Sequence, residues 1–191
     1  MHLLPSSTSE HDGFAVFDDH LDANYPERFR QHGPEINLLK NSGKNLVSFR
    51  FGVLYHQMPA DSGRASHWDL LLEQPPEPGS GLLTFEVSVP PKEWGNSTFV
   101  RKLPNHRPLY LHYEGPLSDD RGIVTRILAG TIQWKVQTLD LLVIAVQSDT
   151  LPSAFSSGTD RDFKIQGELK ISKLDDQINL GRWKMEYTQQ K

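Results

Sequence analysis

The chain has 191 residues, a net charge of −4 and no cysteine, a length that suits one domain with a full hydrophobic core and is short for two. The net charge argues against a protein that coats nucleic acid nonspecifically, because that mode depends on many cationic contacts with phosphates. A cysteine-free sequence excludes disulfides, and no apolar run approaches the length of a membrane span. We therefore expect a monomeric cytoplasmic protein without a membrane partner.

Residues 1–45 are mixed in composition and only weakly periodic. Short helical signals lie near Tyr25–Gln31 and Glu35–Asn41, with apolar residues at helical spacing. This pattern predicts an N-terminal appendage, partly irregular and with short helices, beside a main domain formed by residues 46–191.

From residue 46 onward, apolar and polar residues alternate with a period of two, which is typical of β-strands. The pattern predicts strands at residues 47–56, 67–73, 83–89, 109–113, 121–127, 130–136, 138–147, 163–171 and 182–187. Eight or nine short strands with hardly any helix indicate an all-β fold. We expect a small antiparallel β-barrel of about eight strands rather than a sandwich, because closure removes exposed strand edges, with polar residues gathered at the barrel mouth.

Two histidines and an aspartate form the clearest candidate site. Alternate residues of a strand share a face, so His67 and Asp69 point to the same side, and His56 lies at the end of the preceding strand. We expect these three side chains to meet at the barrel mouth. Two neutral imidazoles and a carboxylate suit a divalent transition metal and leave coordination positions open for water or substrate oxygen.

Other interpretations of these residues remain open. His67 and Asp69 alone are also typical of a hydrogen-bonded surface pair without a metal. Two histidines and one carboxylate also describe the site of a mononuclear Fe(II) oxygenase, in which case His106 or His112 would take the place of a remote His56. Glu73 ends the predicted strand that carries His67 and Asp69, and we expect it to form a structural ion pair.

Six segments of the chain occur in a characteristic order. They are Phe51–His56, His67–Glu73 (His-Trp-Asp-Leu-Leu-Leu-Glu), Val89–Pro90, His106–Gly115 (His-Arg-Pro-Leu-Tyr-Leu-His-Tyr-Glu-Gly), a Gly130–Thr131 turn, and Gly167–Leu169 leading to Gly181–Trp183. In order and spacing, over about residues 46–188, they resemble the 3′-phosphoesterase domain of bacterial DNA ligase D. No single motif is decisive, so the resemblance rests on the collinear set.

The resemblance implies a small β-barrel that binds a divalent metal, manganese first and zinc, cobalt or iron as alternatives. It implies removal of a 3′-phosphate or a 3′-ribonucleoside from DNA or RNA ends, in DNA end processing and repair. The family's metal ligands fall on His56, His67 and Asp69, its phosphate-contacting histidine on His106, and its active-site tyrosine on Tyr110. The sequence carries no ligase or polymerase signature, so we expect a separate ligase or polymerase as a partner.

The chain departs from the family pattern at three points. The loop Gln57–Ser66 between the two histidines is longer by several residues, and residues 1–45 carry no recognisable counterpart of the family's N-terminal catalytic residues. Leu71 stands where the family has a phosphate-binding arginine, and leucine cannot donate a hydrogen bond. Candidate replacements for that arginine are Arg64, Arg101 and Arg107. A noncatalytic protein that binds nucleic-acid or phosphate ends and has lost activity is therefore the alternative function.

Overall fold

The computed structural model describes residues 39–41, 44–75, 81–95, 97–149, 163–174 and 182–190. These residues form the strands β1 (Leu39–Asn41), β2 (Lys44–Leu46), β3 (Phe49–Gln57), β4 (His67–Leu72), β5 (Leu82–Val87), β6 (Thr98–His106), β7 (Gly115–Pro116), β8 (Ile123–Gln137), β9 (Leu141–Ser148), β10 (Gln166–Lys173) and β11 (Arg182–Gln189), and the 3₁₀ helices η3 (Pro91–Glu93) and η4 (Pro108–Leu111). No helix in this part of the chain is long and apolar enough to cross a membrane.

Strands β1 and β2 pair with each other as a separate antiparallel sheet. Strand β1 covers the last residues of the second predicted helical piece, so the helix expected there is wrong at residues 39–41. The remainder of the two predicted helical pieces, residues 25–31 and 35–38, lies outside the described residues.

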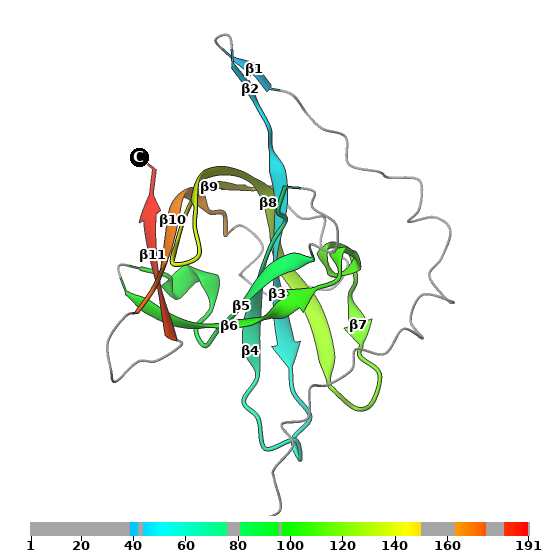
Figure 1. Ribbon diagram of the computed structural model, residues 1–191. Coiled ribbons are helices and arrows are strands. Elements are labelled where there is room, and N and C mark those ends of the chain that lie inside the picture. The colour runs from blue at the N-terminus through cyan, green and yellow to red at the C-terminus, as the bar shows by residue number, and fades with distance from the viewer. Residues whose placement is uncertain are drawn as a thin grey trace, which may run out of the picture. The chain divides into compact units, whose positions relative to one another are not determined.

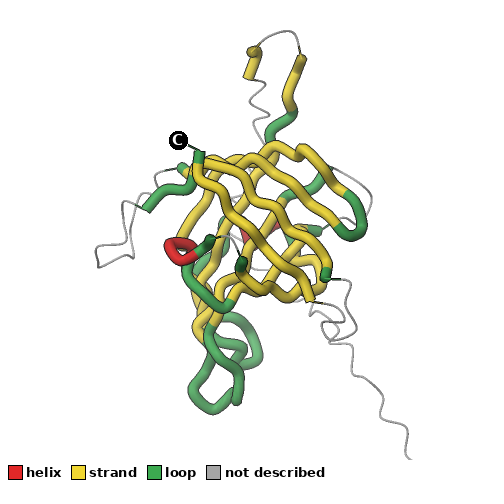
Figure 2. Tube along the Cα trace, turned by 90° about the vertical axis from the view of Figure 1, so that its left-hand side faces the viewer, coloured by secondary structure: helices red, strands yellow, loops and turns green. Residues whose placement is uncertain are grey.

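Eight strands close into an antiparallel barrel, which the two views of Figures 1 and 2 show from perpendicular directions. Their order is β3-β4-β5-β6-β11-β10-β9-β8, and β8 pairs back with β3 to close the ring. Strand β7 is an additional short strand that pairs with the start of β8. The prediction of an all-β antiparallel barrel of about eight strands is confirmed for the described residues.

The barrel interior is filled by the apolar residues that alternate along the strands. Phe51, Val53, Leu70, Leu72 and Phe85 are all buried there. Each such side chain, when fully buried, stabilises the fold by about 1.5–3 kcal/mol. Because side chains alternate between faces, the residues between these positions point to the outside of the barrel.

Strand β8 differs from the sequence prediction. Two strands with a turn at Gly130–Thr131 were expected, whereas residues 123–137 form one strand with an irregularity between Trp134 and Val136. Gly130 is needed for close packing, because a Cβ atom there would lie 2.1 Å from the carbonyl oxygen of Gln147. The first part of β8 pairs with β3 and the last part with β9, so this long strand closes the barrel.

A second apolar cluster covers part of the outer face of β3 and β4. Its buried members are Leu54, Leu71, Leu82, Tyr110, Leu111 and Val124. The strand predicted at residues 109–113 is wrong, because Pro108–Leu111 folds as η4 and contributes Tyr110 and Leu111 to this cluster. Strand β6, which precedes η4, was not predicted, since its residues do not alternate between apolar and polar.

Candidate metal centre

The strand register places the candidate residues side by side. His56 of β3 lies directly opposite His67 of β4. In the next row, Asp69 lies between Leu54 of β3 and Glu86 of β5. Cross-strand neighbours have Cβ atoms about 4.5–5.5 Å apart, so the three predicted ligands gather on one face. That face is the outside of the barrel, because Asp69 alternates with the inward-facing Leu70, and the expected position at the barrel mouth is therefore wrong.

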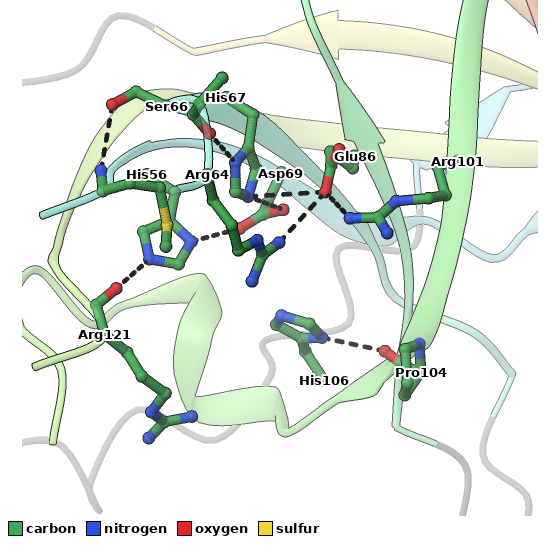
Figure 3. A network of polar contacts seen from close by, with 12 residues as sticks. His56, Arg64, Ser66, His67, Asp69, Glu86, Arg101, Pro104, His106 and Arg121 are labelled. Carbon is green, nitrogen blue, oxygen red and sulfur yellow. Dashed lines mark hydrogen bonds and ion pairs between the residues drawn. The ribbon is translucent and has the colours of Figure 1, made fainter. Parts of the chain in front are cut away.

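The three predicted ligands converge, as Figure 3 shows. Nδ1 of His56 lies 3.6 Å from Oδ2 of Asp69, and Nε2 of His67 lies 3.6 Å from Oδ1 of Asp69. One ligand atom from each residue falls within 4.8 Å of the other two. The two 3.6 Å separations exceed a normal hydrogen bond and lie close to the roughly 3.0–3.4 Å between neighbouring ligands bonded at about 2.1 Å to one ion. Because they end on different oxygens of Asp69 and the group as a whole spans up to 4.8 Å, the three side chains would have to close around the ion to bind it together.

Both imidazoles are held with a specific nitrogen toward Asp69. Nε2 of His56 donates a hydrogen bond to the carbonyl oxygen of Arg121 at 2.7 Å, and Nδ1 of His67 donates to that of Ala65 at 3.0 Å (Figure 3). A carbonyl oxygen only accepts, so these nitrogens carry the proton, and in each neutral ring the lone pair belongs to the nitrogen that faces Asp69. This is the arrangement in which protein backbone fixes a metal-binding histidine.

The site is buried and electron-rich. Asp69 is only 3% exposed, and its Oδ1 accepts no hydrogen bond from the described residues. Burying a carboxylate without a partner is costly, so this atom favours a cation. Burial by itself lowers the pKa of His56, but the interaction with Asp69 and the carbonyl of Arg121 outweigh it and raise that pKa above its ordinary value of 6.5. The Asp69 carboxylate that favours a proton on Nδ1 of His56 would also favour a metal ion at that nitrogen.

The long loop between the two histidines does not separate them. The backbone N–H of Met58 donates to the hydroxyl of Ser66 at 3.0 Å, across the two ends of the loop. Further along the loop, the hydroxyl and the backbone N–H of Ser62 both donate to the carbonyl oxygen of Pro59. The added residues therefore project from the ends of β3 and β4 and leave the pairing of His56 with His67 intact.

Glu86 is a neighbour of the site that the sequence analysis did not single out. Its Oε2 lies 3.9 Å from Nε2 of His67 and 3.5 Å from Nη2 of Arg64, and it forms a close ion pair with Arg101 (Figure 3). The alternation of residues 83–89 marks Glu86 as outward-facing. Which of the outward residues lies beside Asp69 depends on the register between β4 and β5, which alternation alone does not define.

His106 and Tyr110 form a neighbouring pair. Nδ1 of His106 donates to the carbonyl of Pro104 at 3.0 Å, and its ring centroid lies 5.4 Å from that of Tyr110. Figure 3 shows the His106 ring pointing from the end of β6 toward the His56, His67 and Asp69 group. Tyr110 lies in η4, not in the strand predicted at residues 109–113, and it is buried in the outer apolar cluster.

The candidate phosphate-binding arginines differ in position. Arg64 and Arg101 have mostly exposed side chains and both contact Glu86 at the rim of the site. Arg107 precedes η4, and its Nε and Nη1 atoms are buried. Leu71, at the family's arginine position, is 0% exposed and lies within the outer apolar cluster.

Glu73 and His112 belong to a different cluster. Arg50 donates from Nε and Nη2 to the two carboxylate oxygens of Glu73, at 3.0 and 2.6 Å, which confirms the predicted structural ion pair. Arg50 also donates from Nη1 to Nε2 of His112 at 2.9 Å, since a guanidinium cannot accept. This contact anchors the residue that follows η4 to the start of β3.

No family model matches the chain, and no curated protein matches it. The chemistry of the site is therefore argued from its own residues. Two histidines, each with its unprotonated nitrogen directed toward Asp69, and a buried carboxylate can hold a divalent metal ion.

Proposed function

We propose that the protein is a metal-dependent phosphoesterase that acts on the 3′ ends of nucleic acids and removes a terminal phosphate or ribonucleoside. The observation that carries this proposal is the convergence of His56, His67 and Asp69, with each histidine fixed by a backbone carbonyl. The resemblance to the phosphoesterase domain of DNA ligase D supplies the substrate class. A role in DNA end processing in the cytoplasm, with a separate ligase or polymerase as partner, belongs to the same proposal.

His56, His67 and Asp69 would hold the ion, and manganese is the metal we propose. Two nitrogen ligands and one oxygen ligand also accommodate zinc, cobalt or iron, and these are the alternative ions. When bound, the ion neutralises charge on a phosphate and lowers the pKa of a water. The protein's own part is to orient these ligands on the rigid pair of strands β3 and β4.

His106 is the proposed group that contacts the phosphate. Its Nδ1 donates to the carbonyl of Pro104 and its ring points toward the three metal ligands, and an imidazole can donate to a phosphate oxygen or give a proton to the departing sugar oxygen. Tyr110, buried against the His106 ring, is better placed to orient that ring than to meet the substrate. We therefore assign Tyr110 as a positioning residue.

Arg64 and Arg101 are the cations that we propose for binding the phosphate in place of the family's arginine. Both reach the rim of the site next to His67 and Asp69, where they meet Glu86. Guanidinium groups bind phosphate oxygens through paired N–H donors. The buried nitrogens of Arg107 make that residue the weaker candidate of the three.

The assay measures phosphate released from a 3′-phosphorylated primer in the presence of manganese. His67→Ala and Asp69→Ala should each reduce turnover by at least about 100-fold, because each removes a ligand of the ion. Glu168→Gln is the matched control, since Glu168 contacts Lys135 at the exposed surface, and it should turn over like the wild type. Equal turnover by the wild type and the two ligand variants would remove the proposal.

A specific observation supports a second candidate, a noncatalytic binder of phosphorylated ends. Leu71 is buried in an apolar cluster, so a guanidinium is missing where the resembled family has one, and a lost charged clamp reduces such rates by orders of magnitude. This candidate predicts manganese-dependent binding of a 3′-phosphorylated end with no product after long incubation. The iron oxygenase required a remote His56, whereas His56 lies 3.6 Å from Asp69, so we do not propose it.

A further inference from the structure

We propose that Glu86 is shared between the metal centre and the arginines Arg64 and Arg101. Metal binding draws the carboxylate to the ion and leaves both guanidiniums to bind an anionic substrate. This inference rests on the metal site of the proposed function and adds the residue that couples the ion to the anion.

The position of one carboxylate oxygen supports this sharing. Oε2 of Glu86 makes the contacts with Arg64 and Arg101 and also lies 3.9 Å from Nε2 of His67. That nitrogen is the ligand atom of His67, because Nδ1 is bound to the carbonyl of Ala65. Neighbouring ligands of one ion are about 3.0–3.4 Å apart, so at 3.9 Å from Nε2 of His67 this oxygen lies slightly beyond that spacing, and a turn of the Glu86 side chain toward His67 would bring it closer to the ion.

The charges of the cluster favour the exchange. With neutral histidines, the two carboxylates of Asp69 and Glu86 balance the two guanidiniums of Arg64 and Arg101, so the metal-free cluster is neutral and has no net attraction for an anion. A divalent ion adds two positive charges. If Glu86 turns to the ion, the two carboxylates neutralise it, and the two guanidiniums are left to face a phosphate dianion.

The neighbours of Arg64 and Arg101 also favour the movement of Glu86 from the arginines to the ion. Arg101 lies directly opposite Arg182 in the pairing of β6 with β11, and like charges directly opposite each other in a sheet repel. Once Glu86 has turned away, an anion at Arg101 relieves this repulsion. The contact of Glu86 with Arg64 joins partly exposed groups at 3.5 Å, so its loss costs little.

The first experiment measures Mn²⁺ affinity of the metal-free full chain by titration calorimetry. Glu86→Gln should weaken binding by at least about 10-fold, the effect expected for groups around a metal centre. Glu86→Asp keeps the charge but shortens the side chain, so it should weaken binding by a similar factor if contact is direct and should leave it unchanged if only long-range attraction acts. Glu168→Gln, which removes an exposed carboxylate paired with Lys135, should bind Mn²⁺ like the wild type.

The second experiment measures binding of inorganic phosphate without metal. Glu86→Gln should bind phosphate about 10-fold more tightly than the wild type, because its arginines are released, and adding Arg101→Gln should cancel that gain. Circular dichroism confirms that each variant is folded. Wild-type Mn²⁺ affinity in Glu86→Asp, whatever the result for Glu86→Gln, would overturn the sharing of Glu86 and leave the phosphoesterase proposal standing, whereas a wild-type protein that binds no Mn²⁺ would overturn both.

Discussion

His56 and His67 lie directly opposite each other in the antiparallel pairing of β3 with β4, with ring centroids 4.9 Å apart. The register that pairs them also pairs Val53 with Leu70 inside the barrel. A slip by one residue would send the ligands inward and the apolar side chains outward. The hydrophobic core therefore fixes the geometry of the candidate metal centre.

The turn before β8 should control metal affinity through His56. Gly122 has a φ of +97°, and a Cβ atom there would lie 2.1 Å from the carbonyl oxygen of Gln57. Gly122→Ala should therefore shift the neighbouring Arg121 carbonyl that orients His56 and weaken Mn²⁺ binding by about 10-fold or more. Calorimetric titration of the folded variant measures this.

The matched control is Gly63→Ala. Gly63 also has a positive φ, of +66°, but a Cβ atom there meets nothing within 4 Å. The substitution should cost about 1–2 kcal/mol of stability from the backbone conformation and leave Mn²⁺ affinity unchanged. If Gly122→Ala bound Mn²⁺ as tightly as Gly63→Ala, the Arg121 carbonyl would have no role in the site.

The affinity for Mn²⁺ should rise with pH. The pKa of His56 lies above its ordinary value of 6.5, so in the metal-free protein the charged ring stabilises the fold fully below pH 6.5, and that contribution is lost as pH rises through the folded-state pKa. A metal ion must displace this proton. Titrations on both sides of pH 6.5 should show tighter binding at the higher pH, with the same profile in a His112→Ala control, and a flat profile would contradict the role of His56.

The ion pair of Arg50 with Glu73 should stabilise the barrel in a pH-dependent manner. Burial by itself raises the pKa of Glu73, but its hydrogen bonds to Arg50 outweigh this and lower it below its ordinary 4.5. At neutral pH, Glu73→Gln should reduce the free energy of unfolding by about 1.5–3 kcal/mol. The difference should vanish as pH falls through the folded-state pKa, as urea denaturation at neutral and acid pH would reveal. A difference that persisted in acid would point to a packing effect.

Leu71→Arg should not restore the resembled family's arginine. The leucine is buried with Tyr110 and Leu111 of η4, and a guanidinium there would lack a partner among the apolar side chains. We expect a loss of several kcal/mol in the free energy of unfolding, measured by urea denaturation, and no gain in phosphate release. Leu71→Met conserves volume and should cost less than about 1.5 kcal/mol. Tolerance of the arginine with increased turnover would contradict the assignment of Leu71 to this cluster.

The period of two in the sequence predicts the barrel and the convergence of the metal ligands, because both depend on alternation along individual strands. His67 and Asp69 are two residues apart, and His56 ends the strand that pairs with theirs. The sequence pattern predicts the structure less well where a residue's place depends on contact with backbone that is distant in the sequence. Gly130 resembles a turn residue but lies within β8, where the Gln147 carbonyl leaves no room for a side chain.

The alternation at residues 109–113 led to the wrong prediction of a strand. The apolar residues of η4 in this segment cover the outside of the barrel and not its interior. This cover is why Tyr110 is buried and why the site lies beside a second apolar cluster. Glu86 was missed for a related reason, since its place beside Asp69 is set by the pairing of β4 with β5 across an intervening loop.

The most direct test of the account is a crystal of the protein soaked with Mn²⁺, with data collected to locate the ion by its anomalous scattering. We predict a single strong peak on the outer face of β3 and β4, within bonding distance of Nδ1 of His56, Nε2 of His67 and a carboxylate oxygen of Asp69. A peak elsewhere, or none at these residues, would contradict the metal centre on which the proposed function depends.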